Sequence, residues 1–268
     1  IIERTIFMIK SIPKVIHYCW FGGNPIPAEY QRYIDSWKKF LPDHEIREWN
    51  EDNYDVPCIP FSSEAYDVKK FAYVSDYARL KILYEHGGVY FDTDVEVIKS
   101  FDDILARGGF MGQEVGTPSG VSLVSNQAGL GIAVNPGLGI AVAPGLQLYK
   151  EILDYYNSLH FIKGGVMDTT TICTHITEIL KKHGYDEHNK VIQEVAGITV
   201  YPPEYFCPLD YATGKLNITS NTRSIHWYTA SWQSSYSKFK TKLQHLLGPD
   251  ITEKIIKAKG KLKEMAGK

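Results

Sequence analysis

The sequence has few cysteines, little net charge and no long hydrophobic run, and each shortage excludes a class of protein. Its four cysteines form no Cys-x-x-Cys pair and have no histidine at zinc-finger spacing, which favours reduced cytoplasmic thiols over a zinc site or a disulfide framework. A net charge of −2 gives no overall basic surface, so we expect no nucleic-acid partner. The N-terminus also lacks the pattern of a signal peptide.

An uncharged region from Val115 to Tyr149 invites a membrane-spanning interpretation. Glycine, proline, asparagine and glutamine interrupt it throughout, so it contains no run of about 20 apolar residues of the kind that a transmembrane helix needs. The sequence Gly-Leu-Gly-Ile-Ala-Val occurs in it twice, at 129–134 and at 137–142. We interpret this repeat as two short β segments, joined as a hairpin or by a loop.

Hydrophobic residues make up 44% of the 268 residues, which is enough for one large core. Periodicity and turn signals predict helices over 27–40, 64–86, 145–159 and 168–183. They predict strands over 15–21, 45–49, 89–97, 110–113, 191–195, 198–201 and 224–228. Strands that alternate with helices predict an α/β fold with a mostly parallel central sheet. We expect one domain over 8–236 and a basic amphipathic helical tail over 237–268.

The most informative segment is Tyr90-Phe91-Asp92-Thr93-Asp94, which follows a helix expected to end at Gly87. Because side chains alternate along a strand, Asp92 and Asp94 should point to the same side. Two carboxylates on one face suit Mg²⁺ or Mn²⁺, which often bind substrate phosphates as well. The pattern indicates a nucleotide-sugar transferase; the simpler alternative is a solvated strand end with two surface acids.

Asp76 and Arg79 lie three residues apart on the preceding predicted helix and therefore share a face. Asp76 could accept hydrogen bonds from sugar hydroxyls. Arg79 could reach sugar or phosphate oxygens, because its planar guanidinium matches phosphate geometry. A plain intrahelical ion pair is the alternative.

The residues that close the first two predicted strands are candidate nucleotide contacts, since ligands of α/β sheets bind at the carboxyl ends of strands. Trp20 could stack a nucleobase, and the glycines after it would let the backbone approach the ligand. The alternative is a core tryptophan beside a turn. The predicted nucleotide-binding set is His17, Trp20, Phe21, Gly22, Trp49 and Asn50.

Later segments supply further candidates. His226 could be a metal ligand through a neutral imidazole, and Ser231 and Trp232 could close over a diphosphate as a lid. Asp168 is an N-cap candidate, but a helix N-terminus also binds anions and hydroxyl-rich ligands, so it remains a candidate sugar contact. The lysine-rich tail could lie on an anionic membrane surface or pack back onto the domain.

Together these segments resemble glycosyltransferase family 32, whose members carry a sugar-binding DXD motif and include fungal initiating α-mannosyltransferases and bacterial capsule-synthesis enzymes. Residues 12–23, 49–51 and 75–94 carry the resemblance, which is strong over 12–100 and weak over 110–220. More distantly, the same pattern is similar to the catalytic domain of the large clostridial glucosylating toxins.

The resemblance implies a GT-A fold with one nucleotide-binding domain. In such a site Trp20 would stack the base, Asp76, Arg79 and Tyr90 would contact the sugar, and Asp92 and Asp94 would hold Mn²⁺ or Mg²⁺. The implied reaction is the retaining transfer of a hexose from a nucleotide sugar, which we expect to be a UDP-hexose. We expect a glycan or lipid-linked glycan as acceptor and a cytoplasmic role in capsule or surface polysaccharide synthesis, with the tail as a candidate contact to the inner membrane face.

Three alternatives stay open. One is a toxin-like glycosyltransferase that modifies a protein, and another is a non-catalytic nucleotide-sugar-binding protein. The third is a phosphatase of the haloacid-dehalogenase type, which also has Asp-x-Asp at a strand end. That class expects threonine or valine two residues after the second aspartate, whereas this chain has Glu96.

Overall fold

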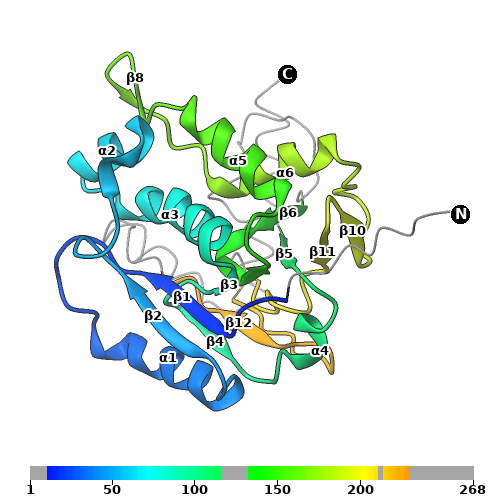
Figure 1. Ribbon diagram of the computed structural model, residues 1–268. Coiled ribbons are helices and arrows are strands. Elements are labelled where there is room, and N and C mark those ends of the chain that lie inside the picture. Colours follow the sequence, from blue (N-terminus) through cyan, green and yellow to red (C-terminus); the bar gives the residue numbers. More distant parts are fainter. Residues whose placement is uncertain (1–10, 116–131, 211–213, 230–268) are drawn as a thin grey trace, which may run out of the picture.

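A computed structural model describes residues 11–115, 132–210 and 214–229, and a mixed β-sheet lies at its centre (Figure 1). The strands of this sheet are β1 (Val15–Cys19), β2 (Glu45–Trp49), β3 (Gly88–Tyr90), β5 (Phe110–Val115), β6 (Ile132–Asn135), β7 (Ile140–Val142), β10 (Gln193–Val195) and β11 (Ile198–Tyr201). Their order is β10-β11-β5-β7-β3-β1-β2, and β6 also pairs with β5. Two small antiparallel pairs complete the strands: β4 (Val95–Val97) with β12 (Ser224–His226), and β8 (Ile162–Lys163) with β9 (Val166–Met167).

The direction of the strands agrees with the predicted class. β1 is parallel to β2 and β3, and β5 is parallel to β11. β7 is antiparallel to both β3 and β5, while β6 and β10 are antiparallel to their partners β5 and β11. β1, β2, β3, β5 and β11 therefore run one way and β6, β7 and β10 the other. The predicted α/β fold with a mostly parallel central sheet is confirmed.

Helices cover both faces of the sheet, and each face has its own apolar core. The helices are α1 (Ala28–Phe40), α2 (Pro60–Asp67), α3 (Phe71–His86), α4 (Asp102–Leu105), α5 (Gln147–Asn157) and α6 (Ile172–Lys182), with short 3-10 turns η1 (Val56–Cys58) and η2 (Pro136–Leu138). Figure 1 shows α3, α5 and α6 on one face, and α1, α4 and the β4–β12 pair on the other. On the second face the fully buried Trp37 donates its indole N–H to the Val95 carbonyl at 2.8 Å.

The long helix predicted over 64–86 is wrong, because two helices occupy this region. α2 ends at Asp67, and Lys69 adopts a left-handed φ of 59° before α3 begins at Phe71. Apolar positions continue at helical spacing across the break, so the apolar period alone does not predict that the helix ends there. The predicted helix end is confirmed, since Gly87 follows α3 with a φ of 67°.

Asp168 was expected to begin a helix, and this N-cap prediction is also wrong. Thr171, in extended conformation, occupies the N-cap of α6, without a side-chain cap bond. Asp168 instead accepts a hydrogen bond from the Thr170 N–H at 3.0 Å, which closes a local turn before the helix.

The described part of the uncharged repeat, residues 132–142, forms one interrupted strand. The predicted hairpin is wrong, whereas a loop between the two segments is confirmed. β6 and β7 do not pair with each other; both pair with β5. Asn135 lies opposite Gly112 and Ala141 opposite Phe110, so residues 136–139 form an insertion between the two segments.

The expected lid residues Ser231 and Trp232 and the expected tail over 237–268 lie outside the described residues. Across the ranges that the structure describes, every helix is too short or too polar to span a membrane.

Two glycines with similar backbone conformation provide a test of the strand contacts. Gly88 has a φ of +100°, and a Cβ there would lie 2.6 Å from the Val15 carbonyl oxygen, whereas Gly108 has a φ of +108° with nothing within 4 Å. Gly108→Ala should lower the free energy of unfolding by about 1–2 kcal/mol through backbone strain alone. Gly88→Ala should cost a further ~1–3 kcal/mol for the clash, measured by urea unfolding. Equal losses would contradict the close β1–β3 contact.

Candidate active site

A buried ion network around Arg79 connects α3 to the turn after β3. Arg79 Nη2 lies 3.0 Å from Asp76 Oδ1, and Nη1 lies 3.2 Å from each carboxylate oxygen of Asp92. Its Nε donates to the Ser75 carbonyl at 3.1 Å. The Arg79 side chain is 5% exposed, whereas that of Asp92 is 28% exposed. Asp92 is therefore the member of the network that a ligand can reach.

Tyr90 orients the same carboxylate from the end of β3. Its hydroxyl donates to Asp92 Oδ1 at 3.1 Å, and the Arg79 guanidinium carbon lies 4.9 Å from the centre of the Tyr90 ring. Three predicted sugar-contacting residues, Asp76, Arg79 and Tyr90, thus surround the first aspartate of the DXD motif.

Burial and charge act against each other in this network. Burial raises the pKa of Asp76 to about 7, with the Asp92 charge adding to the effect and Arg79 opposing it. Burial would lower the pKa of Arg79, but Asp92, Tyr90 and Asp76 outweigh it and hold that pKa well above its usual value. Arg79 is therefore a permanent buried cation facing an accessible carboxylate.

Asp94, the second aspartate of the motif, has different partners. His226 Nε2 lies 3.0 Å from its Oδ1, and the Thr229 N–H and hydroxyl donate to its Oδ2 at 2.8 and 3.0 Å. The pair of aspartates lies in a turn between β3 and β4, so strand alternation does not set their relative orientation. The pairing of β12 with β4 brings the C-terminal segment to the motif.

The charges of Asp94 and His226 stabilise each other. Burial would raise the pKa of Asp94, but His226 and the two Thr229 donors hold it below its usual value. Burial would lower the pKa of His226, but Asp94, and then the Asp92 and Glu114 charges, raise it. The structure thus brings two of the three predicted metal ligands together.

The predicted metal ligands Asp92, Asp94 and His226 offer carboxylate oxygens and one imidazole nitrogen. Carboxylate oxygens and an imidazole nitrogen are accepted ligands for Mn²⁺, and substrate phosphates commonly add more. In the part of the chain that the structure describes, no three histidine, cysteine or acidic side chains are grouped as ready metal ligands. Asp94 and His226 would fit such an ion once His226 has lost its proton, because only a neutral imidazole binds a metal, and the substrate would have to complete the coordination.

His17 and Trp49, both predicted to bind nucleotide, contact each other inside the protein. His17 is fully buried; its Nδ1 accepts the Trp49 indole N–H at 3.0 Å, and its Nε2 lies 3.0 Å from the Gly87 carbonyl oxygen. Trp49 also stacks on His86, with ring centres 5.4 Å apart. Phe21 is 7% exposed. His17 and Phe21 therefore have structural roles in the core, whereas Trp49 is half-buried and contacts both His17 and His86.

Trp20 and Asn50 remain at the carboxyl ends of β1 and β2. Trp20 is half-buried, and its indole N–H donates to the Asn24 carbonyl at 2.8 Å. Asn50 is half-buried too, and its Oδ1 accepts the Asp52 N–H at 2.9 Å. Gly22, with a φ of +108°, donates its N–H to Glu51 at 2.6 Å. This part of the predicted nucleotide site therefore consists of loops that are held by local hydrogen bonds.

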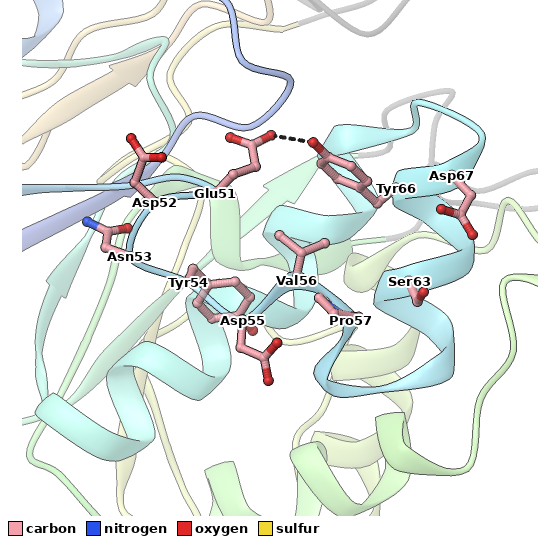
Figure 2. Close-up of a pocket in the computed structure, with 10 residues that line it drawn as sticks. All are labelled: Glu51, Asp52, Asn53, Tyr54, Asp55, Val56, Pro57, Ser63, Tyr66 and Asp67. Atoms are coloured by element: carbon pink, nitrogen blue, oxygen red, sulfur yellow. Dashed lines mark hydrogen bonds between the residues drawn. The ribbon is translucent and has the colours of Figure 1, made fainter.

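Two hollows lie close to these residues. The larger, about 710 Å³, lies between the loop after β2 and α2, and Figure 2 shows Glu51 and Tyr66 facing each other in it, with a hydrogen bond of 2.9 Å. It is lined by Glu51, Asp52, Asn53, Tyr54, Asp55, Val56, Pro57, Ser63, Tyr66 and Asp67. The smaller, about 380 Å³, is lined by Glu29, Tyr30, Arg32, Tyr33 and Thr229. Because Thr229 also binds Asp94, the smaller hollow adjoins the DXD motif.

Asp168 lies near the β8–β9 pair and makes local contacts. Lys163 Nζ lies 2.6 Å from its Oδ2. Although burial acts the other way, hydrogen bonds from Lys163 and Thr170 lower the pKa of Asp168 to about 2. The structure connects Asp168 to its own turn.

Gly137 and Thr229 contact the motif and were missed by the sequence reasoning. Gly137, in the insertion between β6 and β7, accepts the Asp92 N–H at 3.4 Å. The available signal was the asparagine at 135, where the second copy of the repeat has alanine. Thr229 lies 135 residues from Asp94, and local sequence carried no signal for this contact.

Comparisons with known proteins agree with this geometry. Residues 27–111 match the family described as a glycosyltransferase sugar-binding region containing a DXD motif. Inositol phosphoceramide mannosyltransferase 1 of Schizosaccharomyces pombe is 32% identical over 38% of this chain and 34% of its own length. Uncharacterized glycosyltransferase L373 of Acanthamoeba polyphaga mimivirus is 34% identical over 37% of this chain and 42% of its own length.

Among solved structures, the PaToxG glycosyltransferase is similar with a TM-score of 0.42 and 19% identity, over 65% of this chain and 70% of that one. The predicted resemblance to DXD glycosyltransferases is confirmed, because residues 27–111 match the model of a glycosyltransferase sugar-binding region. The chain spans 34% and 42% of the length of the two relatives named above.

The structural role of His17 predicts a pH dependence. Burial lowers the pKa of His17 to about 4 from 6.5 in the unfolded chain, so acid protonates the unfolded state first. As pH falls from 6.5 to 4, this residue should remove up to about 3 kcal/mol from the free energy of unfolding. Urea unfolding from pH 7 to 4.5 should show a steeper decline in the wild type than in His17→Gln. Parallel declines would contradict the assignment.

Proposed function

We propose that this protein is a metal-dependent, retaining glycosyltransferase that moves a hexose from a nucleotide sugar to a hydroxyl of a glycan or lipid-linked glycan. The observation that carries the proposal is the Arg79 network, which fixes Asp92 beside the turn that also holds Asp94. Both lie after the carboxyl end of β3, where ligands of α/β sheets bind.

The Arg79 network supports binding of the donor sugar. Asp92 is partly exposed, and its carboxylate accepts hydrogen bonds, as sugar hydroxyls require. Arg79 is a buried cation close to it and would stabilise negative charge that develops on the leaving diphosphate. A preorganised charge in a water-poor site stabilises such a group more than an exposed lysine would.

Asp94 and His226 would hold the metal ion, with Asp92 as a further ligand. Bound Mn²⁺ or Mg²⁺ would supply Lewis-acid stabilisation of the diphosphate. The protein's own contribution is to hold Asp94 in place through Thr229 and His226. No described side chain is assigned as a nucleophile, in keeping with a reaction in which the leaving phosphate assists deprotonation of the acceptor.

We propose the donor and the acceptor as chemical classes and not as single compounds. Trp20 and the glycines that follow it favour a UDP-hexose, with the half-buried indole as the base-stacking surface. One relative is named an inositol phosphoceramide mannosyltransferase, so a mannosyl donor and a lipid acceptor belong in the same test. A role in capsule or surface polysaccharide synthesis fits either donor.

Nucleotide release from UDP- and GDP-hexoses, with Mn²⁺ or with EDTA, tests the proposal. We expect metal-dependent release from one donor by the wild type. Asp94→Asn should lower kcat by at least about a hundredfold, because electrostatic groups of this kind contribute roughly 10²–10³. Asp35→Asn, a control at an exposed carboxylate paired with Lys38, should keep wild-type turnover.

Near-wild-type turnover by a folded Asp94→Asn protein would contradict the proposed function. Nucleotide binding without release by any variant, with or without an acceptor glycan, would instead support the alternative of a non-catalytic binding protein. Calorimetry with UDP and GDP distinguishes that outcome from a protein that binds neither nucleotide.

A further inference from the structure

The insertion between β6 and β7 reaches the first aspartate of the DXD motif. Residues 136–139 leave the strand that pairs with β5, and Pro136–Leu138 form η2, after which β7 resumes beside β3. At this point the Gly137 carbonyl accepts the Asp92 N–H at 3.4 Å. A break in the strand thus lies against a residue that the proposed reaction requires.

Gly137 leaves no room for a side chain beside Asp92. A Cβ at this position would lie 2.2 Å from Asp92 Oδ2, although real Cβ atoms essentially never come within 3.0 Å of another heavy atom. Gly137 is not among the described glycines with positive φ, so the need for glycine comes from this contact and not from the backbone conformation.

Buried polar groups hold this insertion in place. Asn135 Oδ1 accepts the Gly137 N–H at 2.7 Å, and Asn135 Nδ2 donates to Glu114 Oε2 at 2.6 Å. The Tyr228 hydroxyl donates to the same Glu114 oxygen at 3.1 Å. Asn135 and Glu114 are buried, and buried polar networks with their hydrogen bonds made rigidify the segments that they join.

We propose that the Asn135-Pro136-Gly137 turn is a positioning element that confines the Asp92 carboxylate, with Glu114 and Asn135 fixing the turn. Arg79 and Tyr90 hold that carboxylate by hydrogen bonds. The backbone of Gly137 lies against Asp92 Oδ2 and limits the position of the carboxylate. An effect of this turn on catalysis rests on the proposed function, in which Asp92 contacts the donor. The confinement of the Asp92 carboxylate does not depend on that function.

Kinetics of donor hydrolysis test the catalytic consequence. Gly137→Ala should displace the Asp92 carboxylate and lower kcat by about a hundredfold, a loss typical of a small misplacement of a reacting group. KM for the donor should rise by much less than kcat falls, because Asp92 contacts the sugar while contacts to the nucleobase are untouched. The control is Gly109→Ala, at a glycine that also lacks positive φ and whose Cβ would meet Ala141 O at 3.1 Å; it should keep the wild-type kcat.

A double-mutant cycle in thermal unfolding tests the confinement without any turnover. Gly137→Ala should lower the Tm of the wild type by more than that of Asp92→Ala, because the 2.2 Å clash with Asp92 Oδ2 is then absent and only the contact with Asn135 Oδ1 at 3.0 Å remains. If Gly137→Ala fails to fold alone, the double variant should fold. Additive Tm losses, or a double variant that also fails to fold, would overturn the proposal.

The kinetics of donor hydrolysis and the double-mutant cycle together distinguish failure of this inference from failure of the proposed function. A non-additive cycle with unchanged kcat in Gly137→Ala would show confinement without a positioning role and would overturn the inference. A non-additive cycle in a protein that hydrolyses no donor would uphold the confinement and count against the proposed function.

Discussion

The buried charge of Arg79 is the constraint on which the rest of the site depends. A guanidinium at 5% exposure is stable only if carboxylates and carbonyls occupy its donors, and Asp76, Asp92 and the Ser75 carbonyl do so. This requirement fixes the face that α3 presents to the sheet and the path of the chain after β3. It also leaves Asp92 both held and partly exposed, which is the state that a ligand-binding carboxylate needs.

Irregular backbone at the carboxyl edge of the sheet completes the site. The DXD aspartates occupy a turn, the neighbouring strand breaks at Asn135–Leu138, and the C-terminal segment reaches Asp94 through Thr229. Each departure from regular structure brings a polar group to the motif. Helix α1, by contrast, supplies apolar support, because its Trp37 contacts Phe91, the residue directly before the DXD motif.

Local signals in the sequence predicted the α/β class, the helix end at Gly87, and the grouping of Asp76 and Arg79 near the DXD motif. They failed where the outcome depends on tertiary packing. Lys69 lies between two helices where the apolar period predicts one continuous helix. His17 lies in the middle of β1, and its side chain is fully buried. Thr229 reaches the motif from 135 residues away, which no local pattern encodes, and the signal for Gly137 was one asparagine, Asn135, that differs between the two copies of the repeat.

The most direct test of the account is calorimetric binding of UDP-glucose and of GDP-mannose, each with Mn²⁺, to the wild type and to Arg79→Lys. Lysine keeps the positive charge but loses the fork that holds Asp76 and Asp92 together. The account predicts that one donor binds the wild type and that the folded variant binds it at least about tenfold more weakly, or ~1.4 kcal/mol. Equal affinity in the two folded proteins would contradict the central role of Arg79.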